Sequence, residues 1–284
     1  MRDRIVCFGD VIDDVVVVPE GPIRDDTDTP SEIRYRPGGS PANTAAWLGA
    51  LGARVDFVGV VGAGDAARHA AAMPGVAAHL REHPDLPTGT IVVIVAGQSR
   101  SMLTSRGANS ALDPAEVTDE LLTEASVLHL TGHALLNDAG LGDLLARATA
   151  AGVAVSVSPG SAGFIADYGL PEFRRAIAGA SILFPSLDEG RLLTGLDDPA
   201  AVSAALAEEF DTVVLTMGAA GVMVNGETVQ AVTVDIVDPT GAGDAFCAGF
   251  LAEWAHSRDA LAAARAGVTV AARAVQSIGA RPAP

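Results

Sequence analysis

The chain has 284 residues, and its 18 basic and 35 acidic side chains give a formal net charge of −17. Hydrophobic residues make up 49% and charged residues 19%, a globular composition that excludes general disorder. A chain this acidic has no electrostatic basis for binding nucleic acid or an anionic membrane surface.

Lysine is absent, so every basic residue is an arginine. This excludes a Schiff base and the phosphate-binding lysine of a Walker A loop. The two cysteines, Cys7 and Cys247, lie far apart in apolar segments and are expected to be free thiols in a reducing compartment. No leader-like N-terminus and no long apolar run is evident, so a cytoplasmic location is expected.

The first hundred residues mix short strands with turns. Apolar or β-branched runs predict strands at 4–8, 15–18, 33–36 and 55–61. The alanine-rich stretch 41–52 predicts a helix, and 65–80 is helix-prone apart from Pro74-Gly75. Runs at 90–95 and 101–104 predict a hairpin around 96–98.

From residue 110 onward, helical and strand patterns alternate. Helices are predicted at 114–124, 137–151, 171–179, 188–194 and 199–209, and strands at 127–130, 153–157, 181–184 and 212–216. A hairpin at 221–234 turns at Asn225-Gly226, and helices at 243–256 and 259–276 follow it. This alternation favours a parallel sheet covered by helices on both faces.

The strongest motif is Asp238-Pro-Thr-Gly-Ala-Gly-Asp-Ala-Phe246, between a strand and an apolar helix. The N–H groups and the positive dipole end of that helix suit a phosphate or a developing anion. An aspartate there is a poor phosphate ligand because like charges repel, but it suits a general base that deprotonates an attacking hydroxyl. The alternative is that Asp244 only caps the helix.

This segment resembles the C-terminal signature of the ribokinase-like (PfkB) carbohydrate kinases. A second signature of that family begins at Gly38-Gly39-Ser40-Pro41-Ala42-Asn43, about 200 residues earlier. Shorter similarities follow the family's order at 87–89, 106–109, 186–195 and 216–221. The resemblance covers nearly the whole chain.

The resemblance implies a three-layer α/β/α sandwich with a mostly parallel central sheet and a small β-sheet lid. Residues 1–13, 38–87 and 107–284 would form the core, and residues 14–37 and 88–106 the lid. The reaction implied is transfer of the ATP γ-phosphate to a hydroxyl of a sugar or nucleoside. By similarity, Asp244 is the base, and the N–H groups of Gly241, Ala242 and Gly243 form the anion hole.

The same resemblance assigns binding residues. The acceptor would contact Asp14, for which Asp13 is the alternative, and Gly38, Gly39 and Asn43. Arg106 and Arg100 in the lid region are candidate partners for an anionic group. Nucleotide and Mg²⁺ would lie against Ser186, Glu189, Thr216, Gly218 and Gly221, with Glu189 holding Mg²⁺ through water. Asp238 and Thr240 begin a loop that in many members holds a monovalent cation such as K⁺. A homodimer through the lid is also expected.

Two places depart from the family's pattern, one in the Mg²⁺ site and one that bears on the substrate. Ser186 stands where the family has an asparagine, and serine keeps one hydrogen bond without the reach of the amide. The loop 158–163 holds no arginine, although members that act on sugar acids or sugar phosphates often have a basic residue there. A neutral polyol is therefore favoured. A nucleoside kinase and a non-catalytic sugar-binding homologue stay open as alternatives.

One further pattern is typical of a different class of protein, the dinucleotide-binding enzymes. Gly62-Ala63-Gly64-Asp65-Ala66-Ala67 follows a strand and fits the dinucleotide fingerprint G-x-G-x-x-A. That fingerprint normally follows the first strand of its fold, and Asp65 would face the pyrophosphate. We therefore expect no NAD or FAD here.

Overall fold

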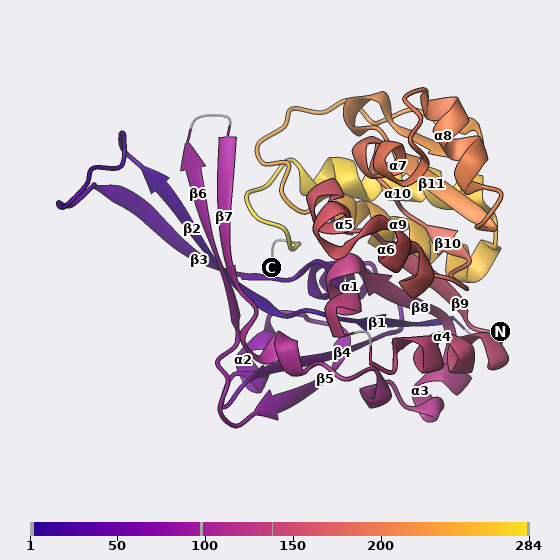
Figure 1. Cartoon of the computed structure of the whole chain (residues 1–284), viewed down its shortest axis with the longest axis horizontal. Coiled ribbons are helices and arrows are strands. Elements are labelled where there is room, and N and C mark those ends of the chain that lie inside the picture. The colour runs from indigo at the N-terminus through magenta and orange to yellow at the C-terminus, as the bar shows by residue number, and fades with distance from the viewer. Residues whose placement is uncertain (1–2, 97–98, 138, 283–284) are drawn as a thin grey trace.

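The computed structural model describes residues 3–96, 99–137 and 139–282, which form one sheet of nine strands and one of four (Figure 1). Gly97 and Gln98, at the tip of the predicted hairpin, lie outside the described residues.

The large sheet is parallel over most of its width. Its order is β13-β12-β11-β10-β9-β8-β1-β4-β5, and β12 runs in the direction opposite to the other eight strands. The strands are β1 (Arg4–Phe8), β4 (Val55–Gly62), β5 (Val76–His83), β8 (Ala125–Thr131), β9 (Ala154–Ser158), β10 (Ile182–Leu183), β11 (Thr212–Thr216), β12 (Val222–Val224) and β13 (Glu227–Val229).

Helices cover both faces of this sheet. One core lies under α1 (Ser40–Ala50), α9 (Ala242–Ser257) and α10 (Ala260–Ala274). The other lies under α3 (Asp119–Glu124), α4 (Leu141–Ala150), α5 (Ala162–Tyr168), α6 (Leu170–Ala176), α7 (Leu187–Thr194) and α8 (Pro199–Leu206). Side chains of β1 alternate between the two cores: Ile5 and Cys7 face the first core, while Val6 and Phe8 face the second. The three-layer sandwich is confirmed.

The remaining elements are short. Helix α2 (Ala66–Ala71) links β4 to β5, and 3₁₀ turns occupy Gly107–Ala111, Pro114–Glu116, Gly132–Asn137 and Gly218–Ala220.

The smaller sheet is built from two excursions of the chain. It contains β2 (Ile12–Pro19), β3 (Ser31–Gly38), β6 (Gly89–Ala96) and β7 (Ser99–Ser105), in the order β3-β2-β6-β7. Figure 1 shows it standing away from the core, so the expected small sheet is confirmed. Its limits as a separate lid, 14–37 and 88–106, stay a prediction.

The structure corrects the helix-prone reading of 65–80. Helix α2 ends at Ala71, Gly75 has a φ of +81°, and Val76–His83 pairs along its whole length with β4 as an edge strand. Local alanine content favoured a helix, but the glycine turn and the sheet edge decide the conformation. Two smaller differences are that 162–176 forms two helices separated by Gly169, and that the hairpin strands end at Val229.

The sheet also fixes where a site can form. Strand β1 lies between β8 and β4, and all three are parallel, so their carboxyl ends meet at one edge. Open α/β sheets bind ligands at such an edge, where the strand order reverses. Here β1 leads to Asp10, and β8 leads to Gly132 and His133.

Candidate active site

The two signature segments, far apart in sequence, are hydrogen-bonded to each other. In the first turn of α9, Asp244 accepts a bond from the Ser40 hydroxyl at Oδ1 (2.5 Å). At Oδ2 it accepts one from the Asn43 amide nitrogen (2.9 Å). Both partners lie on α1, which packs against α9. The predicted base and a predicted acceptor-binding residue therefore lie in one site.

The surroundings of Asp244 tune its acidity. Removal of water from around the carboxylate raises its pKa to about 6, and this outweighs the hydrogen bonds from Ser40 and Asn43 and the charge of Arg281. A carboxylate with this pKa is ionised at neutral pH, yet it is more basic than a solvent-exposed aspartate. That combination suits a proton acceptor.

The N-terminus of α9 requires glycine at Gly241. This residue caps the helix with φ +77°, and a Cβ here would lie 2.5 Å from Cα of Ala280. Gly243 faces open space instead. The N–H of Ala242 donates to the Pro239 carbonyl at 3.2 Å, so a phosphate would have to share or replace that bond.

Across the site, the small sheet supplies Asp14. Its carboxylate lies so close to Gly38 that a Cβ there would force the Asp14 side chain to move. Burial raises the pKa of Asp14 to about 6, the nearby charge of Arg281 lowers it, and Asp13 and Asp244 raise it further. Gly39 has a φ of +93° and passes close to the backbone of Asp10. Asp14, Gly38 and Gly39 therefore line the same side of the site as Asn43.

Arg281 is a site residue that the sequence did not reveal. Its guanidinium donates to Asn43 Oδ1 (3.1 Å), to the Gly38 carbonyl (2.9 Å) and to the Ala72 carbonyl (3.2 Å). It follows the last helix in a short segment without periodicity, so no pattern pointed to it.

A second polar cluster follows β1 and β8. Asp10 is 8% exposed, and its Oδ1 has no hydrogen-bond partner among the described residues. It lies 3.9 Å from Nη2 of Arg106, which donates to the His133 carbonyl at 3.2 Å. Arg106 thus reaches the strand ends beside the site, where Asp10 and His133 are additional neighbours.

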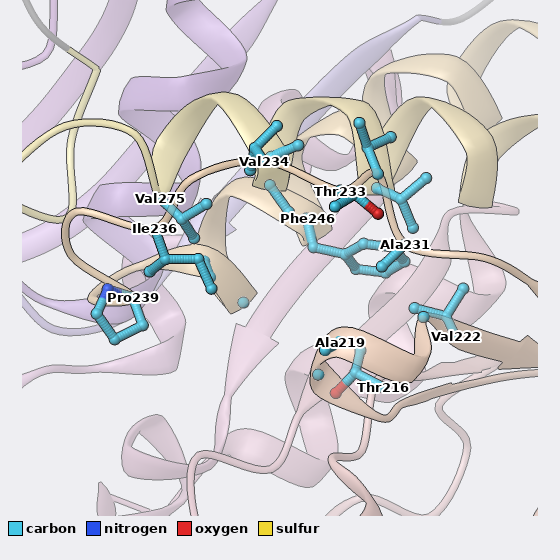
Figure 2. A pocket seen from close by; sticks show the side chains of 18 residues that line it. Thr216, Ala219, Val222, Ala231, Thr233, Val234, Ile236, Pro239, Phe246 and Val275 are labelled. Atoms are coloured by element: carbon cyan, nitrogen blue, oxygen red, sulfur yellow. The ribbon is translucent and has the colours of Figure 1, made fainter.

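A pocket of about 370 Å³ opens beside the N-terminus of α9 (Figure 2). Its wall includes the predicted nucleotide residues Thr216, Gly218 and Gly221 together with Ala242 and Gly243. Figure 2 shows Val234, Ile236 and Val275 on one side, Thr216 and Ala219 on the other, and Phe246 between them. The lining is mostly apolar at one end and reaches the helix N-terminus at the other.

Ser186 and Glu189 form the N-terminal cap of α7. The Ser186 hydroxyl accepts from the Glu189 N–H (3.3 Å), and the Glu189 carboxylate accepts from the Ser186 N–H (2.6 Å). Burial raises the pKa of Glu189, which is 5% exposed. Burial raises the pKa of the Cys247 thiol, and the charges of Asp244 and Glu189 raise it further.

Asp238 connects the predicted cation loop to the end of the chain. Its Oδ1 accepts from the Thr240 N–H (2.9 Å), and its Oδ2 accepts from the Gly279 N–H (3.0 Å). The predicted cation loop is therefore joined to the segment at Gly279.

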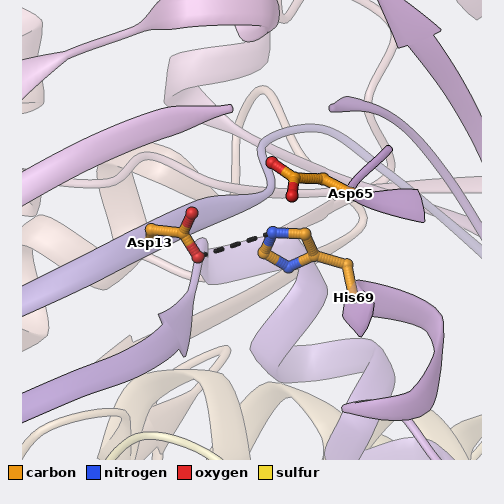
Figure 3. Close-up of side chains that lie close together, drawn as sticks. All are labelled: Asp13, Asp65 and His69. Atoms are coloured by element: carbon orange, nitrogen blue, oxygen red, sulfur yellow. Dashed lines mark ion pairs between the residues drawn. The ribbon is translucent and has the colours of Figure 1, made fainter. Parts of the chain in front are cut away.

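A third group of charged residues lies at the base of the small sheet. Asp13, Asp65 and His69 come together there, with His69 Nε2 3.5 Å from Asp13 Oδ1 (Figure 3). Arg68 donates to both oxygens of Asp13 and to Asp65. Because this guanidinium already supplies the positive charge, we assign no metal ion to the group. Asp65 belongs to the fingerprint-like segment, and its bonds to Arg68 and Thr88 are structural.

Comparison with known proteins decides the family. The model of the pfkB family carbohydrate kinases matches residues 2–284. The chain belongs to this family. It is therefore a phosphotransferase whose acceptor is a hydroxyl group.

The chain is 28% identical to the ribokinase of Haemophilus influenzae in an alignment 299 positions long, which covers 99% of this chain and 95% of the relative. Its fold matches adenosine kinase from Sinorhizobium meliloti with a TM-score of 0.87 at 22% identity, covering 99% of this chain and 96% of that one. It also matches a ribokinase II from E. coli, solved in complex with ATP and Mg²⁺, with a TM-score of 0.84 at 22% identity and 99% and 94% coverage.

Within the ranges that the structure describes, no helix has the length and hydrophobicity needed to cross a membrane.

Proposed function

We propose that the chain transfers the γ-phosphate of ATP to a hydroxyl of a neutral sugar or sugar-like polyol, with Asp244 as general base. The observation that carries this proposal is the placement of Asp244. Its carboxylate is held by Ser40 and Asn43 in the first turn of α9, next to the pocket of Figure 2. A base beside a helix N-terminus can deprotonate the acceptor while N–H groups stabilise the transferred phosphoryl charge.

On the acceptor side, Asp14 and Asn43 orient the substrate. One ionised carboxylate can accept from two neighbouring hydroxyls, so Asp14 suits a diol. Gly38 and Gly39 allow the backbone to approach the sugar, and Arg106 contributes from the strand ends. Closure of the small sheet over this side would exclude water, so that ATP is not hydrolysed instead.

On the nucleotide side, the apolar part of the pocket would hold the adenine, and Thr216, Gly218 and Gly221 line its opposite wall. The N–H groups of Gly241, Ala242 and Gly243 would form the anion hole. Glu189 would hold Mg²⁺ through water, and the cation would neutralise charge on the phosphates. Ser186 contributes by capping α7 and fixing Glu189.

A nucleoside acceptor is the second candidate. The His133 ring lies 4.7 Å from that of Phe164, which stacks on Tyr168 at 5.7 Å, close to Arg106. Such rings could support a nucleobase. The neutral sugar stays first because the loop 158–163 holds no arginine and the carboxylate of Asp10 lies 3.9 Å from Arg106.

We also propose that a monovalent cation binds at the loop of Asp238 and Thr240, close to the anion hole. Asp238 holds that loop against Gly279, which supports the assignment. Replacing K⁺ with choline at constant ionic strength should lower kcat if the cation takes part. Equal rates in both salts would remove this part of the proposal.

The proposal is tested by measuring ADP release from MgATP against a panel of pentoses, hexoses, deoxy sugars, sugar acids and nucleosides. One neutral sugar that raises turnover well above the rate with water would support it. A nucleoside as best acceptor would favour the second candidate. A flat panel would favour the non-catalytic alternative.

A further inference from the structure

The segment after the last helix is fastened to the site at several points. The Gly279 N–H donates to Asp238, and the Trp47 indole donates to the Ala280 carbonyl at 2.9 Å. Gly241 packs so closely on Ala280 that a Cβ would collide with it. These contacts fix the segment 279–280 against the site, and they therefore also fix the position of Arg281, the next residue.

The Arg281 guanidinium spans three elements. It bonds to Asn43 on α1, to Gly38 at the end of β3 and to Ala72 just after α2. Its planar fork suits this simultaneous contact, which a lysine ammonium could not reproduce with the same geometry. Gly38 and Asn43 are the residues predicted to bind the acceptor, so Arg281 lies at the edge of the acceptor site.

The contact with Asn43 determines which way its amide faces. The Arg281 Nε–H donates to Asn43 Oδ1, so the amide nitrogen of Asn43 points to the other side. There it donates to Asp244 Oδ2 at 2.9 Å. Asn43 is 5% exposed, so water cannot readily replace either bond. A reversed amide would place its NH₂ against Arg281 and its oxygen against the carboxylate.

We propose that Arg281 is a positioning residue for phosphoryl transfer: through Asn43 it fixes the carboxylate of Asp244. This inference rests on the proposed role of Asp244. It adds a residue outside both signature segments to the catalytic arrangement.

The charges around Asp244 set the expected pH effect. The titratable groups that interact electrostatically with Asp244 are Asp14 from β2, Arg281 and Cys247 on α9, and Cys247 also interacts with Glu189 at the start of α7. Arg281 lowers the pKa of both Asp14 and Asp244. Although burial lowers the pKa of Arg281 to about 10, the guanidinium remains charged at neutral pH. Loss of its charge should therefore shift the acid limb of the rate profile to higher pH.

Three variants separate charge from geometry. Arg281→Met removes both, so we expect kcat to fall by at least about 10-fold and the acid limb of kcat to move upward in pH. Arg281→Lys keeps the charge, so the limb should stay in place while kcat falls less. Arg281→Gln should move the limb as the methionine variant does. A methionine variant with wild-type kcat and an unmoved limb would overturn the proposal.

Coupling to Asn43 provides a second readout. Because Arg281 acts through Asn43, the losses in kcat caused by Arg281→Lys and Asn43→Ala should be less than additive in the double variant. Strictly additive losses would contradict the proposal, and this measurement does not depend on the methionine variant folding. Arg175→Met, an exposed arginine on α6, serves as the matched control for kcat and Tm.

Asp244→Asn in the same assay separates the two claims. If it is inactive while Arg281→Met behaves as wild type, only the inference about Arg281 fails. If Asp244→Asn is fully active, the proposed function itself fails.

Discussion

The carboxylate of Asp244 combines the two properties that a general base requires. It is ionised at neutral pH, and it is also basic enough to accept a proton, because loss of water raises its pKa to about 6. Ser40 and Asn43 hold both of its oxygens and limit that rise. The pKa of Asp244 therefore reflects the loss of water, which raises it, and two uncharged donors and the Arg281 guanidinium, which lower it.

We predict that kcat/KM for the acceptor falls as pH drops below about 6. Protonated Asp244 cannot accept the hydroxyl proton, and protonated Asp14 binds a diol less well; both groups have pKa values near 6. The pH profile of the wild type, measured with saturating MgATP, checks this. An acid limb near the usual aspartate pKa of about 3.9 would contradict it.

We predict that Asp244→Asn stabilises the fold at neutral pH. Because the folded-state pKa of Asp244 is raised above its unfolded value of 3.8, the carboxyl favours folding below that value, and the contribution is lost as pH rises through about 6. Asparagine keeps the shape, with its oxygen facing Asn43 and its NH₂ facing Ser40.

The stabilisation should be about 1 kcal/mol, since Asp244 is only partly buried and solvent screens part of the effect. Tm measured at pH 5 and pH 7.5 checks this: the advantage of the variant should be larger at pH 7.5. A variant less stable than wild type at both pH values would contradict it.

Sequence patterns located some site residues and missed others for a physical reason. Asp244, Asn43 and Gly241 lie in signature segments where glycine, amide and carboxylate follow a fixed spacing. Arg281 lies in an irregular segment, and its role depends on contacts with α1, β3 and α2 that no local pattern encodes.

At the scale of elements, the start of α9 depends on two glycines with different constraints. Gly241 has a positive φ and packs on Ala280, whereas a Cβ on Gly243 would meet nothing within 4 Å. We predict that Gly241→Ala lowers Tm and displaces the 279–281 segment, while Gly243→Ala leaves Tm unchanged or raises it slightly.

Thermal unfolding of the two variants makes the comparison directly, because each adds one methyl group to the same helix start. Equal Tm changes would show that neither the φ of Gly241 nor its contact with Ala280 limits the fold.

Element boundaries show where local patterns are insufficient. The alternation after residue 110 gave the order of helices and strands, since the buried strands there are short and mainly apolar or β-branched. The local pattern did not predict the edge strand β5, because its outward positions are polar or alanine and only its pairing with β4 makes it a strand.

At the scale of the whole molecule, the small sheet has two different faces. Strand register places Asp14 and Arg36 side by side on one face, and Arg36 lies close to Gly279 of the core. Tyr35, Ile33 and Leu103 belong to the opposite face and are 78%, 53% and 60% exposed. An apolar face directed away from the core suits contact with another protein surface.

We propose that a second copy of the chain covers this face, and we predict a homodimer. Tyr35→Asp combined with Leu103→Asp should give a monomer, because each charge would be buried in the interface. Sedimentation equilibrium checks this. A monomeric wild type, or a double variant that still forms dimers, would contradict it.

The central claim is that Asp244 takes the proton from the acceptor hydroxyl. The most direct test is kcat of Asp244→Ala with the best acceptor of the panel, at pH 7.5 with saturating MgATP. We predict a loss of at least about 10²-fold with little change in Tm and in MgATP affinity, because a general base contributes on this scale. A variant that turns over at the wild-type rate would contradict the account.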